Sequence, residues 1–183
     1  MSHTEVRISG FGGQGVILAG YLVGKAAALY DHRYATLVQS YGPEARGSAC
    51  SAQVIIADEP IHYPYLTRPD IVIAMSQEAY TTFAAELKPE GLLLIDEDLV
   101  VPDPVRPDVR LFRIPATRLA EQLGHRIVAN VVMLGCLTAL AQVATVEAMT
   151  QALATSFPSS AVALNQKAFE SGYDYGRAAQ IPA

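Results

Sequence analysis

Apolar and polar positions follow two different periods along the first two thirds of the chain. Short apolar runs without internal breakers predict strands, and longer apolar stretches that end at Gly, Pro or polar clusters predict helices. The predicted strands are residues 6–9, 34–39, 49–57, 70–75, 92–96 and 109–114, with a short strand stub at 61–63. The predicted helices are residues 16–29, 77–87 with Ser76 as the cap, 116–123, 127–143, 146–156 and 159–171.

The alternation of strands and helices, followed by a helical last third, predicts an α/β fold. Only nine residues, 40–48, separate the second predicted strand from the third. A crossover between parallel neighbours needs about a dozen residues or more, so these two strands are expected to be antiparallel. We therefore predict a Rossmann-like, mixed but mostly parallel sheet with flanking helices and a helical C-terminal section. The length of 183 residues suits a single domain over 1–183.

Composition and charge narrow the functional class. Hydrophobic residues make up 51% and charged residues 17%, which excludes a disordered chain, and the net charge of −5 argues against a nucleic-acid footprint. Cys50 and Cys136 form no ligand cluster, so their thiols cannot build an iron–sulfur or zinc site alone, and no metal site is expected. The polar start of the chain is no secretory signal, which favours the cytoplasm and free thiols.

Residues 127–146 carry no charge over 20 positions and resemble a membrane span. However, Asn130, Thr138, Gln142 and Thr145 fall within about 120° of one helical face. We therefore favour a helix buried between the sheet and a partner chain over a bilayer span.

Residues 10–15 form a Gly-rich turn between a predicted strand and a predicted helix. Gly10, Gly12 and Gly15 satisfy the GxGxxG pattern, which is typical of a backbone that approaches a phosphate at a helix start. Gly13 adds freedom, and Gln14 offers an amide to a phosphate or a base. An NAD site would need an acidic residue at the end of the second strand, which instead ends in Gln39-Ser40. A phosphate-bearing ligand, NAD or flavin, and a turn needed only for packing remain open.

A second distinctive string follows the second strand, where ligand crevices of α/β sheets form. It reads Tyr41-Gly42-Pro43-Glu44-Ala45-Arg46-Gly47. Arg46 can hold a carboxylate or phosphate through two hydrogen bonds, with Glu44 nearby. Alternatively, a Glu44–Arg46 pair only stiffens the loop, or the loop docks another subunit. The sequence contains no Ser–His–Asp set and no paired-carboxylate motif that we can defend, so no catalytic residue is expected on this chain alone.

Three strings occur in the same order as in a known family: GFGGQGV at 10–16, QSYGPEARG at 39–47 and DIVIAMSQEAY at 70–80. The chain resembles the gamma subunit of 2-oxoacid:ferredoxin oxidoreductases, and the second string is most similar to the 2-oxoglutarate branch. Residues 130–135 and 165–172 resemble the C-terminal helices of that family. The family usually has two glycines after the arginine, where this chain has Gly47-Ser48.

The resemblance implies an enzyme that oxidatively decarboxylates a 2-oxoacid to an acyl-CoA and passes electrons to ferredoxin, or runs the reverse. It implies a hetero-oligomer with thiamine-bearing alpha and beta subunits and a ferredoxin-like or cluster-bearing subunit. Thiamine diphosphate, Mg and iron–sulfur clusters then lie on those partners, with nothing held covalently here. The pyrophosphate of CoA is expected at Gly10, Gly12, Gly13, Gln14 and Gly15. Tyr41, Pro43, Glu44, Arg46 and Gly47 are expected at the ligand edge or a subunit interface.

Two other classes stay open. A standalone NAD- or flavin-binding Rossmann-like oxidoreductase would share the Gly-rich turn, and a ligand-free assembly module would use that turn for packing only.

Overall fold

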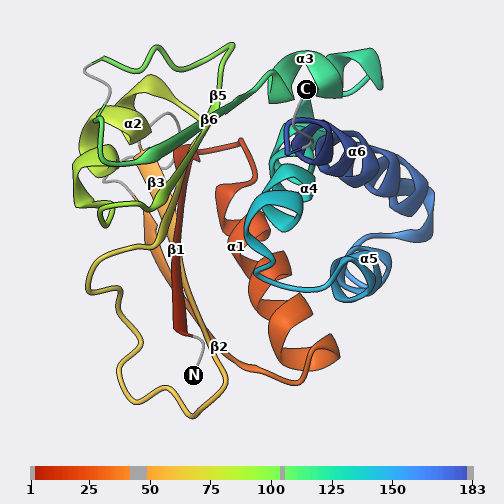
Figure 1. Ribbon diagram of the computed structural model, residues 1–183. Helices are drawn as coiled ribbons and strands as arrows, with labels where there is room; N and C mark the ends of the chain where they lie inside the picture. Colours follow the sequence, from red (N-terminus) through yellow and green to blue (C-terminus); the bar gives the residue numbers. More distant parts are fainter. Residues whose placement is uncertain (1–2, 42–48, 104–105, 181–183) are drawn as a thin grey trace.

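The computed structural model describes residues 3–41, 49–103 and 106–180, and a six-stranded sheet runs through its centre (Figure 1). The strand order is β2-β3-β1-β4-β5-β6. The strands are β1 (His3–Phe11), β2 (Tyr34–Tyr41), β3 (Ala49–Ala57), β4 (Ile71–Ala74), β5 (Leu92–Asp96) and β6 (Arg110–Ile114). Within this sheet, β3 is antiparallel to both β1 and β2, while β1, β4, β5 and β6 are parallel. The mixed, mostly parallel sheet and the antiparallel pairing of the second and third strands are confirmed.

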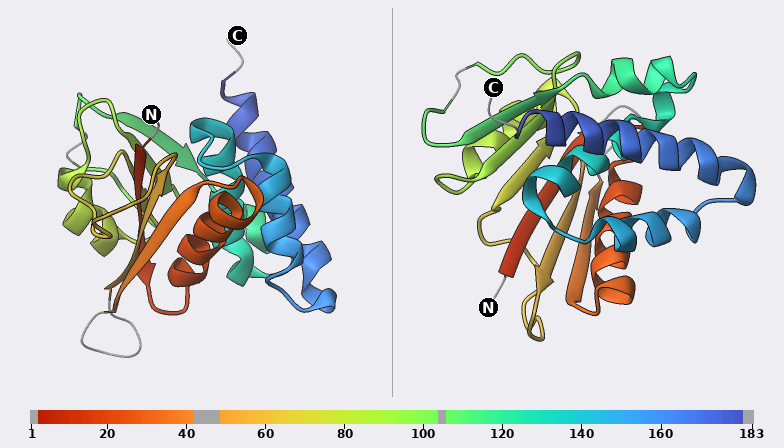
Figure 2. Two further views of the ribbon diagram at one scale, coloured as in Figure 1. Left: turned by 90° about the horizontal axis from the view of Figure 1, so that it is seen from below. Right: turned by 45° about the vertical axis from the view of Figure 1, so that its right-hand side comes forward.

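Helices cover both faces of the sheet, unequally (Figures 1 and 2). The helices are α1 (Val16–Lys25) with a π-helical turn η1 (Ala26–Tyr30), α2 (Gln77–Phe83) with a 3₁₀ turn η2 (Ala84–Glu86), α3 (Ala116–Gln122), a 3₁₀ turn η3 (Arg126–Val128), α4 (Ala129–Ala141), α5 (Val146–Ala154) and α6 (Ser159–Ala178). Helix α2 lies on one face, and α1, α4, α5 and α6 lie on the other. The Ser76 hydroxyl caps α2 by accepting the N–H of Ala79, as predicted.

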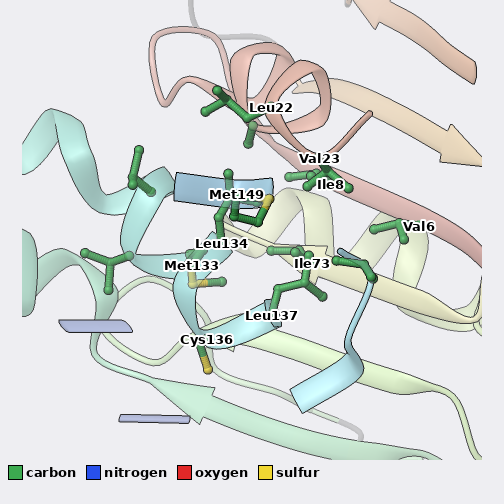
Figure 3. Packing of buried hydrophobic residues seen from close by; sticks show 14 of the residues in the cluster. Val6, Ile8, Leu22, Val23, Ile73, Met133, Leu134, Cys136, Leu137 and Met149 are labelled. Atoms are coloured by element: carbon green, nitrogen blue, oxygen red, sulfur yellow. The ribbon is translucent and has the colours of Figure 1, made fainter. Parts of the chain in front are cut away.

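Side chains of β4 alternate between two hydrophobic clusters, because successive residues of a strand point to opposite faces: Ile73 joins the larger cluster and Val72 the smaller one. Val6 and Ile8 join the larger cluster, in which α1, α4 and α5 supply Leu22, Leu134 and Met149 (Figure 3). The smaller cluster lies beneath α2 and includes Val72, Leu93 and Tyr80. Both cysteines are buried and free, and desolvation raises the pKa of the Cys136 thiol to about 12.

The uncharged segment forms α4, and the chain's own α6 covers it. Residues 129–138 are all buried. A Cβ at Gly135 would overlap the Phe169 carbonyl, and one at Gly172 would overlap the Val132 carbonyl, so the two helices touch backbone to backbone. The expectation that a partner chain buries this helix is therefore corrected for residues 129–138, which this chain's own elements bury. Ile127, just before the helix, is 71% exposed. Among the described residues, no helix combines the length and the apolar composition needed to cross a membrane.

The first strand is longer than predicted, His3–Phe11 against 6–9. Two further predictions, the strand at 61–63 and the end of the last helix, were wrong for identifiable reasons. The stub at 61–63 is not a strand: Pro60 and Pro64 flank it, and the segment lies outside the sheet. The last helix extends past Ser171 to Ala178. Gly172 and Gly176, which suggest a helix end in sequence, are instead the positions where α6 meets α4.

Candidate functional site

The carboxyl ends of β1, β4, β5 and β6 share one edge of the sheet, because these strands are parallel. The chain leaves β1 into α1 on one face and leaves β4 into α2 on the other (Figure 1). Neighbouring strands whose connections diverge in this way open a crevice beyond their carboxyl ends, where ligands of such folds bind. The Gly-rich turn lies at this point.

Gly15 is required by both conformation and packing. It begins α1 with a left-handed backbone, φ 72°. A Cβ there would overlap the side-chain amide of Asn130, which donates to the Gly15 carbonyl at 3.1 Å. Asn130 belongs to α4, so this contact ties the turn to the C-terminal half of the chain.

Gln14 fastens the turn to β4. Its Oε1 accepts the N–H of Phe11 at 2.7 Å, and its Nε2 donates to the Met75 carbonyl at 2.7 Å. A Cβ at Gly10 would overlap that same Oε1. Both ends of the Gln14 amide are therefore hydrogen-bonded inside the chain, so Gln14 shapes the turn.

The start of α1 remains open. Gly12 and Gly13 are exposed, and a Cβ at Gly13 would meet nothing within 4 Å. Within the described residues, the N–H groups of Val16, Ile17 and Leu18 have no acceptor. These donors and the positive end of the helix dipole suit an anion such as a phosphate.

A cleft of about 240 Å³ continues from this helix start. It is lined by Gly13, Gln14, Met75, Thr117, Arg126, Ile127 and Ala129. Sites that enclose a whole cofactor-sized ligand usually measure about 300–1,000 Å³. The cleft therefore holds only part of a cofactor-sized ligand.

Arg126 brings a positive charge to this cleft, and sequence reasoning missed it. Its side chain is exposed and makes no hydrogen bond or ion pair with the described residues. A guanidinium in this state can bind a phosphate through two hydrogen bonds. The sequence does carry one sign of this residue: Arg126 is the last charged residue before the uncharged stretch 127–146.

Asp96 holds Thr117, which lines the same cleft as Arg126. Sequence reasoning missed this residue as well. Its carboxylate lies at the buried end of β5 and accepts the backbone N–H and the hydroxyl of Thr117, at 3.1 and 2.6 Å. Desolvation raises the pKa of Asp96, and the hydrogen bonds from Thr117 oppose that rise. Asp96 thus anchors the start of α3 beside the cleft.

The second string of the sequence attaches to the same edge. Tyr41 on β2 pairs with Cys50 on β3, and Cys50 pairs on its other side with Gly10 on β1. The end of β2 and the start of β3, which the loop joins, are therefore next to the Gly-rich turn. Pro43, Glu44, Arg46 and Gly47 lie outside the described residues. At the described end of β2, Gln39 and Ser40 are exposed and no carboxylate is present for a ribose. The described side chains also include no cluster of three or more residues able to hold a metal ion.

Comparison with known proteins identifies relatives over nearly the full length. The sequence profile of the pyruvate ferredoxin/flavodoxin oxidoreductase family matches residues 5–175. The 2-oxoglutarate synthase subunit KorC of Methanocaldococcus jannaschii is 47% identical over 175 residues, covering 94% of each chain. The same subunit of Methanothermobacter marburgensis is 48% identical over 174 residues, covering 92% of this chain and 94% of that one.

Solved structures agree with the sequence match. The keto/oxoacid ferredoxin oxidoreductase gamma subunit from Geobacter sulfurreducens superposes with a TM-score of 0.89 at 40% identity, over 98% of this chain and 99% of that one. The 2-oxoglutarate:ferredoxin oxidoreductase from Magnetococcus marinus, solved with 2-oxoglutarate, coenzyme A and succinyl-CoA, gives a TM-score of 0.89 at 23% identity. That match covers 100% of this chain and 32% of the longer one, and at this identity it shows the shared fold.

Proposed function

The chain belongs to the pyruvate ferredoxin/flavodoxin oxidoreductase family and is a subunit of a 2-oxoacid:ferredoxin oxidoreductase, and we propose that it is the gamma subunit of an enzyme acting on 2-oxoglutarate. Two observations support this substrate: the relatives named 2-oxoglutarate synthase at 47% and 48% identity, and the string QSYGPEARG. The reaction converts 2-oxoglutarate and CoA to succinyl-CoA and CO₂ with transfer of two electrons to ferredoxin, or runs the reverse. The whole chain acts as one gamma-type domain in this proposal.

The role we assign to this chain is binding of CoA at the carboxyl edge. The pyrophosphate lies against the exposed glycines, Gly12 and Gly13, and the open N–H groups at the start of α1. Gly10, Gln14 and Gly15 hold that backbone in shape, and Arg126 pairs with a phosphate across the cleft. The open start of α1 beside Arg126 is the observation that carries this assignment.

The small cleft also explains why the chain works with partners. A cleft of about 240 Å³ contacts only part of CoA, so neighbouring subunits must enclose the rest. We propose thiamine-bearing alpha and beta subunits and a ferredoxin-like or cluster-bearing subunit as those partners, with thiamine diphosphate, Mg and iron–sulfur clusters on them. Tyr41, Pro43, Glu44, Arg46 and Gly47 would lie at the ligand edge or at the contact with these subunits. A complex that uses ferredoxin, with buried free thiols on this chain, suits the reducing cytoplasm.

Arg126→Ala in the assembled complex tests the CoA assignment. A hydrogen bond to a charged group contributes about 1.5–3 kcal/mol, so we expect the KM for CoA to rise about 10- to 100-fold. The KM for 2-oxoglutarate should stay unchanged, and Arg126→Lys should restore part of the affinity. Arg110→Ala, at an exposed arginine that begins β6 on the opposite edge, is the control. An unchanged KM for CoA in Arg126→Ala would remove Arg126 from the site.

A further inference from the structure

A second cavity lies at the amino edge of the sheet, opposite the CoA cleft. It measures about 360 Å³ and lies between the start of β1, the end of β3 and the segment that joins β3 to β4. We call it the tyrosine pocket; its lining includes Glu5, Ala57, Glu59, His62, Tyr63 and Tyr65. Figure 1 shows the connecting segment beyond the amino ends of the strands.

Tyrosine rings at this pocket are unusually exposed. Tyr63 is 63% and Tyr65 is 51% exposed, and their ring centroids lie 5.5 Å apart at an interplanar angle of 54°. Tyr34 on β2 is 48% exposed and pairs with Ala57 on β3, which in turn pairs with His3 on β1. Paired residues point to the same face of a sheet, so Tyr34 lies on the face of the sheet that bears Ala57 and His3 of the pocket. Tyrosine is enriched where proteins meet other proteins, since its ring is apolar and its hydroxyl tolerates water.

The C-terminal end of the segment that carries these rings, residues 66–68, is hydrogen-bonded to the sheet. The buried carboxylate of Glu5 accepts the backbone N–H groups of Thr67 and Arg68 at 3.0 and 2.9 Å. Gln53 on β3 accepts the N–H of Leu66 at 3.3 Å. Because these hydrogen bonds already restrain the backbone next to Tyr65, a partner that binds this ring loses less conformational entropy.

The charge of the pocket selects its occupant. Its lining contains the carboxylates of Glu5 and Glu59, the imidazoles of His3 and His62, and no Lys or Arg. Glu5 is engaged with the segment and with His3, whereas Glu59 is exposed and makes no hydrogen bond or ion pair with the described residues. Aromatic faces beside a carboxylate bind an ammonium or guanidinium group.

We propose that the tyrosine pocket receives an Arg or Lys side chain from another subunit of the oxidoreductase complex. The inference rests on the proposed function, because it requires the chain to work within a hetero-oligomer. The pocket lies at the amino edge, so a subunit anchored there leaves the carboxyl edge open for CoA. Tyr63 and Tyr65 supply the ring faces, and Glu59 supplies the counter-charge.

Photo-crosslinking of the intact complex tests the proposal. Benzoyl-phenylalanine is placed at position 63, and at the exposed Tyr21 of α1 as a control, and the complex is purified through a tag on this chain. We expect position 63 to crosslink to another subunit within a few residues of an Arg or Lys, identified by mass spectrometry. A crosslink to a second copy of this chain, or to a segment without a basic residue, overturns the proposal.

Charge reversal gives the second readout. Glu59→Lys should lower the affinity of the chain for the rest of the complex by tenfold or more. Reversing the crosslinked cation to Glu should restore it. Glu170→Lys, at an exposed carboxylate on α6, is the matched control. An unchanged affinity for Glu59→Lys, and for the double variant Tyr63→Ala with Tyr65→Ala, overturns the proposal.

The wild-type chain distinguishes failure of this proposal from failure of the proposed function. If the wild-type chain co-purifies with CoA-dependent activity, an unchanged affinity of the variants concerns the pocket alone. If the wild-type chain co-purifies with no other subunit, the proposed function fails as well.

Discussion

Gly15 shows how one residue holds the candidate site together. Its left-handed φ of 72° costs an L side chain roughly 1–2 kcal/mol, and a Cβ there also displaces the Asn130 amide. Gly15→Ala should therefore lower the free energy of unfolding by more than the conformational cost alone. Urea denaturation of the isolated chain measures the difference.

Two further variants separate the conformational cost from the overlap. Gly13→Ala is also placed at positive φ, 97°, but its Cβ meets open space, so it should pay only the conformational cost. Asn130→Ala removes the overlapping amide, so adding Gly15→Ala in that background should cost less than in the wild type. Equal costs for Gly13→Ala and Gly15→Ala would contradict a role for Asn130.

Spacing alone predicted the Gly-rich turn, since GxGxxG between an apolar strand and an apolar helix is a local pattern. The same residues could not reveal what Gln14 does. Its amide bonds Met75, which is 61 positions away in the sequence, and that neighbour exists only because β1 and β4 pair. Arg126 was missed for the same reason: its place beside the turn depends on how α4 packs.

At the scale of elements, the contact between α4 and α6 makes the sharpest prediction. A Cβ at Gly172 would overlap the Val132 carbonyl, which belongs to helix backbone and cannot rotate away. Gly172→Ala should therefore force the helices apart and cost about 1–3 kcal/mol, the usual cost of overpacking. Thermal and urea unfolding of the isolated chain report this loss.

Gly24→Ala is the matched control on α1. Its Cβ would meet only Val54, at 4.0 Å, so the better helix propensity of Ala should leave stability unchanged or raise it by up to about 1 kcal/mol. If both substitutions raised stability, close packing at Gly172 would be refuted.

Sequence periodicity predicted most elements because each buries an apolar face of the expected period. The strands 49–57 and 92–96 match at both ends, and their apolar runs stop at polar or turn residues. The end of α6 was misjudged because a glycine at a helix–helix contact and a glycine that ends a helix look the same in one sequence. The burial of α4 was assigned to a partner because the tertiary position of α6 is not encoded in the pattern of α4 itself.

On the scale of the whole molecule, the two edges of the sheet have different characters. Within the part of the chain that the structure describes, the carboxyl edge has an open helix start and an arginine, Arg126, with no hydrogen-bond partner, which suit an anion. The amino edge has exposed tyrosines and the Glu59 carboxylate, which has no partner among the described residues, and these suit a cation. Because the sheet separates the two edges, a ligand and a partner subunit can be held at once.

The carboxyl edge should bind CoA more tightly than NAD. A ligand that binds only the folded chain raises its unfolding free energy by about 2.7 kcal/mol at one hundred times its Kd. If the proposed site is correct, CoA should raise the unfolding temperature of the chain, because its pyrophosphate would lie at the start of α1 and Arg126 would pair with one of its phosphates. NAD at the same concentration should have a much smaller effect, since the described end of β2 offers Gln39 and Ser40 and no carboxylate for the ribose. Arg126→Ala should reduce the rise in unfolding temperature that CoA causes, with Arg110→Ala as its control. CoA and NAD both carry a pyrophosphate, so only contacts to the rest of each molecule distinguish them. A rise with NAD as large as that with CoA would therefore contradict the assignment and favour a dinucleotide enzyme.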